Sequence, residues 1–180
     1  GTNKQDQESD KIWTKGIILN TEITDPSNYR SLRHLDMWLK KNKIVGITGV
    51  DTRNLTNLIR DKGAPKGTIV FSKNKKFNIK ELVKLTNKWS GLKNLDLAQK
   101  VSTTKNYIWS GLKTWKKNKG YLRNKKQSFH VVAVDYGIKK NILRYFSDFN
   151  CKVSVVNCKT DAKEILRLKP NGVFLSNGPG

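Results

Sequence analysis

Apolar and polar positions follow a strand–helix–strand–helix–strand order over residues 129–180. Three short apolar runs predict buried β-strands, at 129–134, 152–156 and 172–176. Between them, apolar residues recur at helical spacing over 138–149, and Asp161 with Glu164 three positions later resembles the capping box that starts a helix. Short connections between such elements indicate parallel strands in a doubly wound sheet, which binds ligands beyond the carboxyl ends of its strands.

Residues 1–110 contain a less regular mixture of apolar runs and helical spacings. Short apolar runs predict strands at 16–19, 44–50 and 68–71, and helical spacing predicts helices at 32–39 and 79–86. A further helix is predicted between a capping residue, Asp51, and a C-terminal glycine, Gly63. Because the elements mix strands with helices and do not repeat, we expect an N-terminal mixed α/β domain over residues 1–110, with its beginning missing.

Residues 111–128 form a basic, polar stretch that separates the two halves. Its pattern has little periodicity, so we expect a solvated linker. An RNA- or phosphate-binding tail is the alternative, in which Trp115 and Tyr121 would stack on bases. The predicted fold class is therefore α/β: an N-terminal mixed domain, a basic linker, and the first, truncated part of a doubly wound parallel-sheet domain over 129–180.

The net charge of +22 raises the possibility of a nucleic-acid-binding protein. Only seven of the 36 basic residues are Arg, the residue that contacts phosphates and bases with a bidentate fork. The lysines are spread along the chain among many Asn and Ile residues, as compositional drift toward A/T-rich codons would produce. We therefore favour drift over nucleic-acid binding, and do not expect nucleic acid as a partner.

Other features of the composition suggest a protein of the cytoplasm. No segment approaches the roughly 18 consecutive apolar residues that a membrane helix needs. Two cysteines are too few for a disulfide framework, which fits a reducing compartment. The chain starts at Gly1 and stops directly after Gly178-Pro179, a loop-like sequence, so we expect it to be an internal piece of a longer protein.

Two loops are predicted at the carboxyl ends of the parallel strands: 135–137, with the sequence Asp-Tyr-Gly, and 177–180, with the sequence Asn-Gly-Pro-Gly. Glycines let a substrate approach the main chain closely, and Pro179 favours an extended Gly178. A rigid loop with an exposed N–H group suits an oxyanion hole. A tight turn between strand and helix explains the same residues, and the spacing alone leaves both interpretations open.

Several motifs resemble one enzyme family. The run 174–180, FLSNGPG, looks like the loop that precedes the nucleophile elbow in class I glutamine amidotransferases. The run 132–144 is similar to the D-[FY]-G-x-K-x-N-I-x-R sequence that opens the amidotransferase domain of carbamoyl-phosphate synthase small subunits. Further runs resemble the N-terminal domain of the same subunit, at 1–3, 50–56, 60–63, 67–69 and 96–103. The resemblance covers essentially the whole chain except the linker.

This resemblance implies a ligase subunit that hydrolyses glutamine with a Cys–His–Glu arrangement. It implies that the ammonia passes to a large subunit, which uses ATP and Mg to make carbamoyl phosphate for arginine and pyrimidine synthesis. By position, Gly178 would be the oxyanion-hole glycine, and Gly178 and Gly180 would contact the glutamine. The partner would be the large subunit, in a heterodimer or a higher oligomer. We expect no cofactor bound by this chain.

The catalytic residues themselves are not expected among the 180 residues. No G-x-C-x-G elbow is present, so Cys151 and Cys158 are interpreted as packing residues, and His34 and His130 as structural or surface residues. No Cys/His cluster has metal-ligand spacing, and no phosphate-binding loop motif occurs. We therefore place the catalytic Cys, His and Glu after residue 180 and expect the chain alone to be inactive. A basic nucleic-acid-binding module, or a class I amidotransferase serving anthranilate or guanylate synthesis, are the alternatives.

Overall fold

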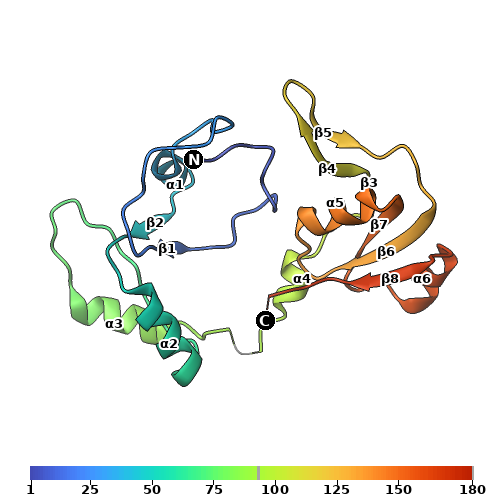
Figure 1. Cartoon of the computed structure of the whole chain (residues 1–180). Helices are drawn as coiled ribbons and strands as arrows, with labels where there is room; N and C mark the ends of the chain where they lie inside the picture. The colour runs from blue at the N-terminus through green and yellow to red at the C-terminus, as the bar shows by residue number, and fades with distance from the viewer. Residues whose placement is uncertain (93, 180) are drawn as a thin grey trace. The chain divides into compact units, whose positions relative to one another are not determined.

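The computed structural model describes residues 1–92 and 94–179, which divide into two compact units (Figure 1). One unit comprises Gly1–Asp6 and Lys11–Lys93, and the other Gln7–Asp10 and Asn94–Gly180. The boundary between the two units therefore lies after residue 93, whereas the sequence predicts it near residue 110. The physical reason is that residues 107–109 form a strand of the second unit's sheet.

The second unit is built on a four-stranded sheet with the order β3-β7-β6-β8 (Figure 1). Its strands are β3 (Tyr107–Trp109), β6 (Phe129–Asp135), β7 (Cys151–Asn157) and β8 (Gly172–Leu175). The central strand β6 runs parallel to both of its neighbours, with Val131 opposite Val153 on one side and Gly172 on the other. This confirms the predicted parallel α/β sheet, to which the structure adds β3 as an antiparallel edge strand.

Successive residues of β6 point to opposite faces of the sheet, and each face has its own core. Ala133 packs in a cluster with Leu143, which comes from helix α5 (Lys140–Asp148). Val132 and Val134 pack in a second cluster with Ile165, which comes from helix α6 (Ala162–Arg167). Both faces of β6 are thus buried, which explains its continuous apolar run from Val131 to Val134.

The two helices of this sheet begin in different ways. Helix α6 has the predicted cap, because Asp161 Oδ1 accepts a hydrogen bond of 2.7 Å from the Glu164 backbone N–H. Helix α5 follows Lys139, whose side chain makes no capping hydrogen bond. Its first turn is capped from far away in the sequence: Glu8 Oε2 accepts a hydrogen bond of 2.8 Å from the Asn141 N–H. A carboxylate near the N-terminus of a helix also interacts favourably with the helix dipole.

Glu8 pairs with a second group of the same helix. Its Oε1 atom accepts a hydrogen bond of 2.8 Å from Nη1 of Arg144, whose side chain is only 5% exposed. The Arg144 guanidinium also lies over the ring of Tyr121, 4.2 Å from the ring centre. A buried guanidinium requires a paired anion, and Glu8 supplies it.

The basic stretch 111–128 contains a β-hairpin instead of the irregular linker expected from the sequence. Strands β4 (Gly111–Lys116) and β5 (Gly120–Arg123) pair antiparallel, and Trp115 lies opposite Tyr121. Asn118 and Gly120 take positive φ values of 65° and 68° at the turn, a conformation that Asn and Gly tolerate best. The aromatic residues considered for base stacking are therefore a cross-strand pair.

Among its described residues, 1–6 and 11–92, the first unit contains a pair of parallel strands and three helices. The elements are β1 (Gly16–Ile18), β2 (Val45–Ile47), α1 (Leu35–Lys41), α2 (Thr52–Lys62) and α3 (Ile79–Lys88). Asp51 caps α2 as predicted, since its Oδ1 accepts a 2.9 Å hydrogen bond from the Asn54 N–H, and Gly63 follows with φ of 79°. Residues 68–71 are not a strand, because no neighbouring strand pairs with them in the described part of the chain.

The helices of the described residues are short. None of them has both the length and the apolar composition that crossing a bilayer would require.

Candidate functional site

The candidate site lies at the carboxyl edge of the sheet, where β6 and β8 end side by side. The strands that follow β6 in the chain lie on opposite sides of it, β7 on one and β8 on the other. Such a reversal leaves a crevice between the loops that follow the two strands, and open α/β sheets bind ligands there. The loops concerned are 135–137 and 176–179.

Asp135 organises the first of these loops. Its side chain is buried, and Oδ1 accepts hydrogen bonds of 2.8 Å from the N–H groups of both Gly137 and Ile138. Gly137 has φ of 111°, in the region that favours glycine, and a Cβ built there would lie 2.9 Å from Cγ2 of Val101. The loop therefore needs the carboxylate and the glycine together.

Gly178 lies directly against this first loop. A Cβ built on it would lie 2.8 Å from the carbonyl oxygen of Tyr136 and 3.1 Å from its Cβ. Pro179 is close as well, with its Cδ 3.7 Å from the position of a Cβ on Gly137. This close contact with the Tyr136 backbone explains why Gly occupies position 178, while the approach of a substrate to Gly178 stays a prediction. Gly180, the other predicted ligand residue, lies outside the described residues.

A third segment, residues 102–106, joins the same edge after helix α4 (Leu97–Val101). The other carboxylate oxygen of Asp135, Oδ2, accepts a 2.7 Å hydrogen bond from the Thr103 N–H. Asn157, at the end of β7, donates from Nδ2 to the Thr103 carbonyl at 2.6 Å, and Ser102 Oγ accepts from the Cys158 N–H at 3.0 Å. The sequence marked 96–103 only as part of a resemblance, and nothing local in it indicates that these residues meet β6 and β7.

Neither cysteine is placed as a nucleophile. Cys151 opens β7 in the core, as the sequence predicts, and burial raises the pKa of its thiol. A buried thiol of raised pKa is a poor source of thiolate. Cys158 follows the end of β7, and neither histidine is its partner in the described structure: His130 Nε2 bonds Ser154 Oγ at 2.9 Å, and His34 caps helix α1.

Tyr107 and two carboxylates shape the electrostatics near this edge. Burial, followed by the negative charges of Asp135 and Asp10, raises the pKa of Tyr107 to about 12. The phenol therefore stays neutral over the working range of most enzymes. Among residues 1–92 and 94–179 no group of three His, Cys, Asp or Glu side chains is arranged to hold a metal ion.

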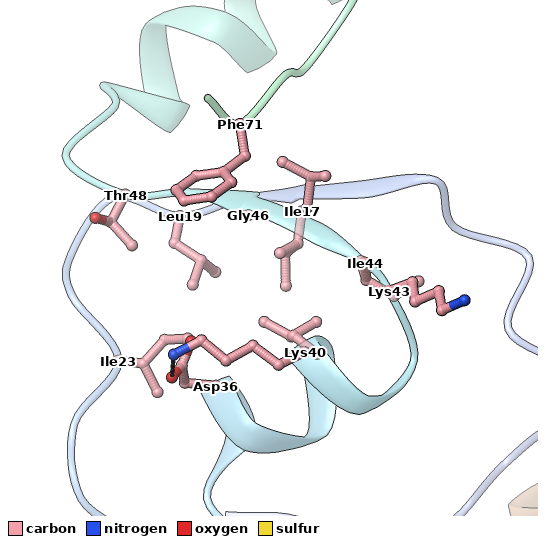
Figure 2. A pocket seen from close by; sticks show the side chains of 12 residues that line it. Ile17, Leu19, Ile23, Asp36, Lys40, Lys43, Ile44, Gly46, Thr48 and Phe71 are labelled. Atoms are coloured by element: carbon pink, nitrogen blue, oxygen red, sulfur yellow. Dashed lines mark hydrogen bonds and ion pairs between the residues drawn. The ribbon is translucent and has the colours of Figure 1, made fainter. Parts of the chain in front are cut away.

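A separate hollow of about 500 Å³ lies within the first unit (Figure 2). Ile17 and Leu19 point into it from one side and Phe71 closes its upper part, while α1 forms the opposite wall. An ion pair of 2.7 Å between Asp36 and Lys40 lies at its edge. The lining is otherwise mainly apolar and contains neither Cys nor His, so the loops 135–137 and 176–179 remain the candidate site.

Comparisons with known proteins agree with this geometry. The family model for the carbamoyl-phosphate synthase small chain, CPSase domain, matches residues 1–69, and that for class I glutamine amidotransferases matches residues 132–180. The second match contains both loops of the candidate site.

Whole proteins that resemble the chain carry a consistent name. The carbamoyl phosphate synthase small chains of Bradyrhizobium diazoefficiens and Agrobacterium fabrum are both 46% identical to it, over 184 and 186 residues, and that of Bartonella henselae is 48% identical over 186 residues. Each match covers 100% of this chain and 46% of the relative, so the chain spans about half the length of these relatives. The chain belongs to the family of carbamoyl-phosphate synthase small chains, and its second unit contains the matched amidotransferase region.

Proposed function

We propose that this chain contributes the glutamine-binding loop of the ammonia-supplying subunit of a carbamoyl-phosphate synthase. The observation that supports the proposal most directly is the position of Gly178. Its backbone lies against the carbonyl of Tyr136 at the carboxyl edge of a doubly wound sheet, where ligands of such sheets bind. No side chain at residue 178 covers the N–H group, so a substrate oxygen could reach it.

The reaction requires an N–H group of this kind. A cysteine thiolate attacks the side-chain carbonyl carbon of glutamine, and the carbonyl oxygen takes up negative charge. The C–N bond then breaks, and the leaving NH₂ group takes up a proton and departs as ammonia. The glutamyl thioester that remains is hydrolysed by water to glutamate. An N–H aimed at the developing oxyanion is worth about 10²–10³-fold in kcat. In this proposal Gly178 N–H is such a donor, and Gly180 contributes to glutamine binding.

The nucleophile is proposed to come from outside these 180 residues. Cys151 is buried in the core, and Cys158 lies at the end of a strand without an imidazole partner in the described part of the chain. The relatives are about twice as long as this chain, which leaves room for a Cys–His–Glu arrangement elsewhere. The chain by itself is therefore proposed to bind but not to hydrolyse glutamine.

The partner in this proposal is a large subunit. The relatives are called small chains, a name that implies a larger partner chain. ATP and Mg would bind to that subunit, which joins the ammonia to bicarbonate and transfers phosphate to give carbamoyl phosphate. This product would serve arginine and pyrimidine synthesis in the cytoplasm.

The test uses the complete gene product that contains this chain, produced with the large subunit from the same organism. We expect glutamate release from glutamine, and carbamoyl phosphate formation when bicarbonate, ATP and Mg are added. The isolated chain of 180 residues is the control, and is expected to release no glutamate. A complete, folded complex that releases no glutamate would contradict the proposal.

A further inference from the structure

Two hydrogen bonds connect the two loops of the site through one hydroxyl group. Ser176 follows β8, and its Oγ accepts a hydrogen bond of 2.9 Å from the backbone N–H of Tyr136. The same hydroxyl donates to the carbonyl oxygen of Asn177 at 2.7 Å. The backbone of Ser176 is itself fixed, because its N–H donates to the Val134 carbonyl at 3.1 Å. The hydroxyl thus accepts from the Tyr136 N–H and donates to the Asn177 carbonyl.

The Asn177 carbonyl belongs to the same peptide unit as the Gly178 N–H. That unit is planar, with the C=O and N–H groups pointing in opposite directions, so fixing one fixes the other. Glycine gives the backbone unusual freedom to rotate, which means that a peptide unit next to Gly178 needs an external restraint. Ser176 supplies it at the carbonyl. Within the described residues the Gly178 N–H makes no hydrogen bond, so it can donate to a ligand.

The same hydrogen bonds also make the Gly178 N–H a stronger donor. They form a continuous series from the Tyr136 N–H through the Ser176 hydroxyl to the Asn177–Gly178 peptide. Hydrogen bonds in series polarise one another. A peptide whose carbonyl accepts a hydrogen bond carries more positive charge on its N–H, which favours an anionic acceptor.

We propose that Ser176 is a positioning residue that aims and polarises the Gly178 N–H toward the oxyanion formed from glutamine. This inference rests on the proposed glutaminase function. Ser176 touches no reacting atom in this arrangement. Its effect is transmitted through the Asn177–Gly178 peptide.

The kinetic test compares Ser176→Ala and Ser176→Thr in the complete gene product assembled with its large subunit. The oxyanion exists only after attack, so the loss should be concentrated in kcat and leave KM nearly unchanged. We expect Ser176→Ala to lower kcat for glutamate release by about 10- to 100-fold, somewhat less than removal of a donor. Ser176→Thr keeps the hydroxyl and should restore most of the activity. Ser154→Ala, which removes a hydroxyl of the same sheet that bonds His130, is the matched control and should keep wild-type kcat.

A second measurement separates positioning from a general loss of structure. In the 15N-labelled chain of 180 residues, Ser176→Ala should speed hydrogen exchange at the Tyr136 amide and shift the Gly178 amide resonance. Amides in the middle of β6 should not change. If Ser176→Ala does not fold, Ser176→Cys provides the same comparison, because a thiol keeps the volume and is a weak donor and acceptor.

The outcomes distinguish this inference from the function on which it rests. An active wild type with unchanged kcat in Ser176→Ala would overturn the inference and leave the glutaminase function standing. Equal losses in Ser176→Ala and Ser176→Thr would also overturn it, because the hydroxyl would not be the cause. A folded wild-type complex without glutaminase activity would overturn the proposed function, and the role of Ser176 with it.

Discussion

Replacing Asp135 by Asn tests how the carboxyl edge of the sheet is held together. The buried carboxylate accepts three backbone hydrogen bonds, two on Oδ1 and one, from Thr103, on Oδ2. An amide has only one oxygen. If that oxygen keeps the bonds from Gly137 and Ile138, the NH₂ group faces the Thr103 N–H, and two donors then point at each other.

The size of the effect follows from these bonds. Hydrogen bonds to a charged group are worth about 1.5–3 kcal/mol and neutral ones about 0.5–1.5 kcal/mol. The variant loses one charged bond and weakens two others, while a neutral amide costs less to bury than a carboxylate. We expect the free energy of unfolding of the second unit to fall by about 2–3 kcal/mol. With a urea slope of about 1–3 kcal/mol per molar, its midpoint should fall by roughly 1 M or more.

Urea unfolding, monitored through hydrogen exchange of the backbone amides in β6 and β7, would measure this loss of stability in the second unit. Asp161→Asn is the matched control, because it makes the same chemical change at an exposed helix cap. Asn caps a helix about as well as Asp, so this control should change the stability by less than about 0.5 kcal/mol. Equal effects of the two substitutions would refute the reasoning, since the three-bond arrangement of Asp135 would then contribute nothing beyond an ordinary cap.

Three further predictions concern other residues. Gly178→Ala should lower glutamate release by the complete protein about 100-fold or more, because the new Cβ would meet the Tyr136 carbonyl oxygen. Gly172→Ala is the control and should stay active, because a Cβ there meets no atom within 4 Å. Equal activities of the two variants would contradict this prediction. Burial raises the pKa of Tyr107 from 10.0 to about 12. The contribution of the neutral phenol to the free energy of unfolding is therefore complete below pH 10 and is lost as the pH rises to 12. Because this side chain is 37% exposed, wild type should lose only about 1 kcal/mol relative to Tyr107→Phe over that range in urea titrations; parallel pH profiles would contradict this. Iodoacetamide should modify Cys158 before Cys151, whose buried thiol has a raised pKa, and mass spectrometry showing equal rates would contradict this.

The sheet of the second unit could be predicted because its information is local. Short runs rich in apolar residues predict the parallel strands, helical spacing predicts α5, and Asp161 predicts the start of α6. The hairpin at 111–123 differs from the predicted linker, because its basic residues are typical of a solvated segment. Its signal was present in Asn118 and Gly120, two turn residues, and in aromatic residues on either side of them.

Contacts between distant residues left no such local signal. Glu8 lies 133 residues before Asn141 and 136 before Arg144, yet it caps α5 and pairs with its buried guanidinium. The run 132–144 resembles a family motif that includes Arg144, but nothing in the sequence indicates which group this side chain contacts. The structure gives the physical reason for that arginine, because its charge is buried and held by an acidic segment from the start of the chain.

The loop 177–179 shows which part of the candidate site the sequence does not indicate. The residue types of 177–179 indicated exposed backbone and restricted torsions, and the structure places this backbone against Tyr136. Whether an N–H can stabilise an oxyanion depends on its direction, and direction is set by a hydroxyl that lies outside the glycine pattern. Ser176 is an ordinary residue at the end of an ordinary strand, and only the pairing of β8 with β6 brings it to the Tyr136 amide. The candidate ligand residues are thus recognisable by residue type, whereas the residue proposed to aim them is recognisable only by its hydrogen bonds.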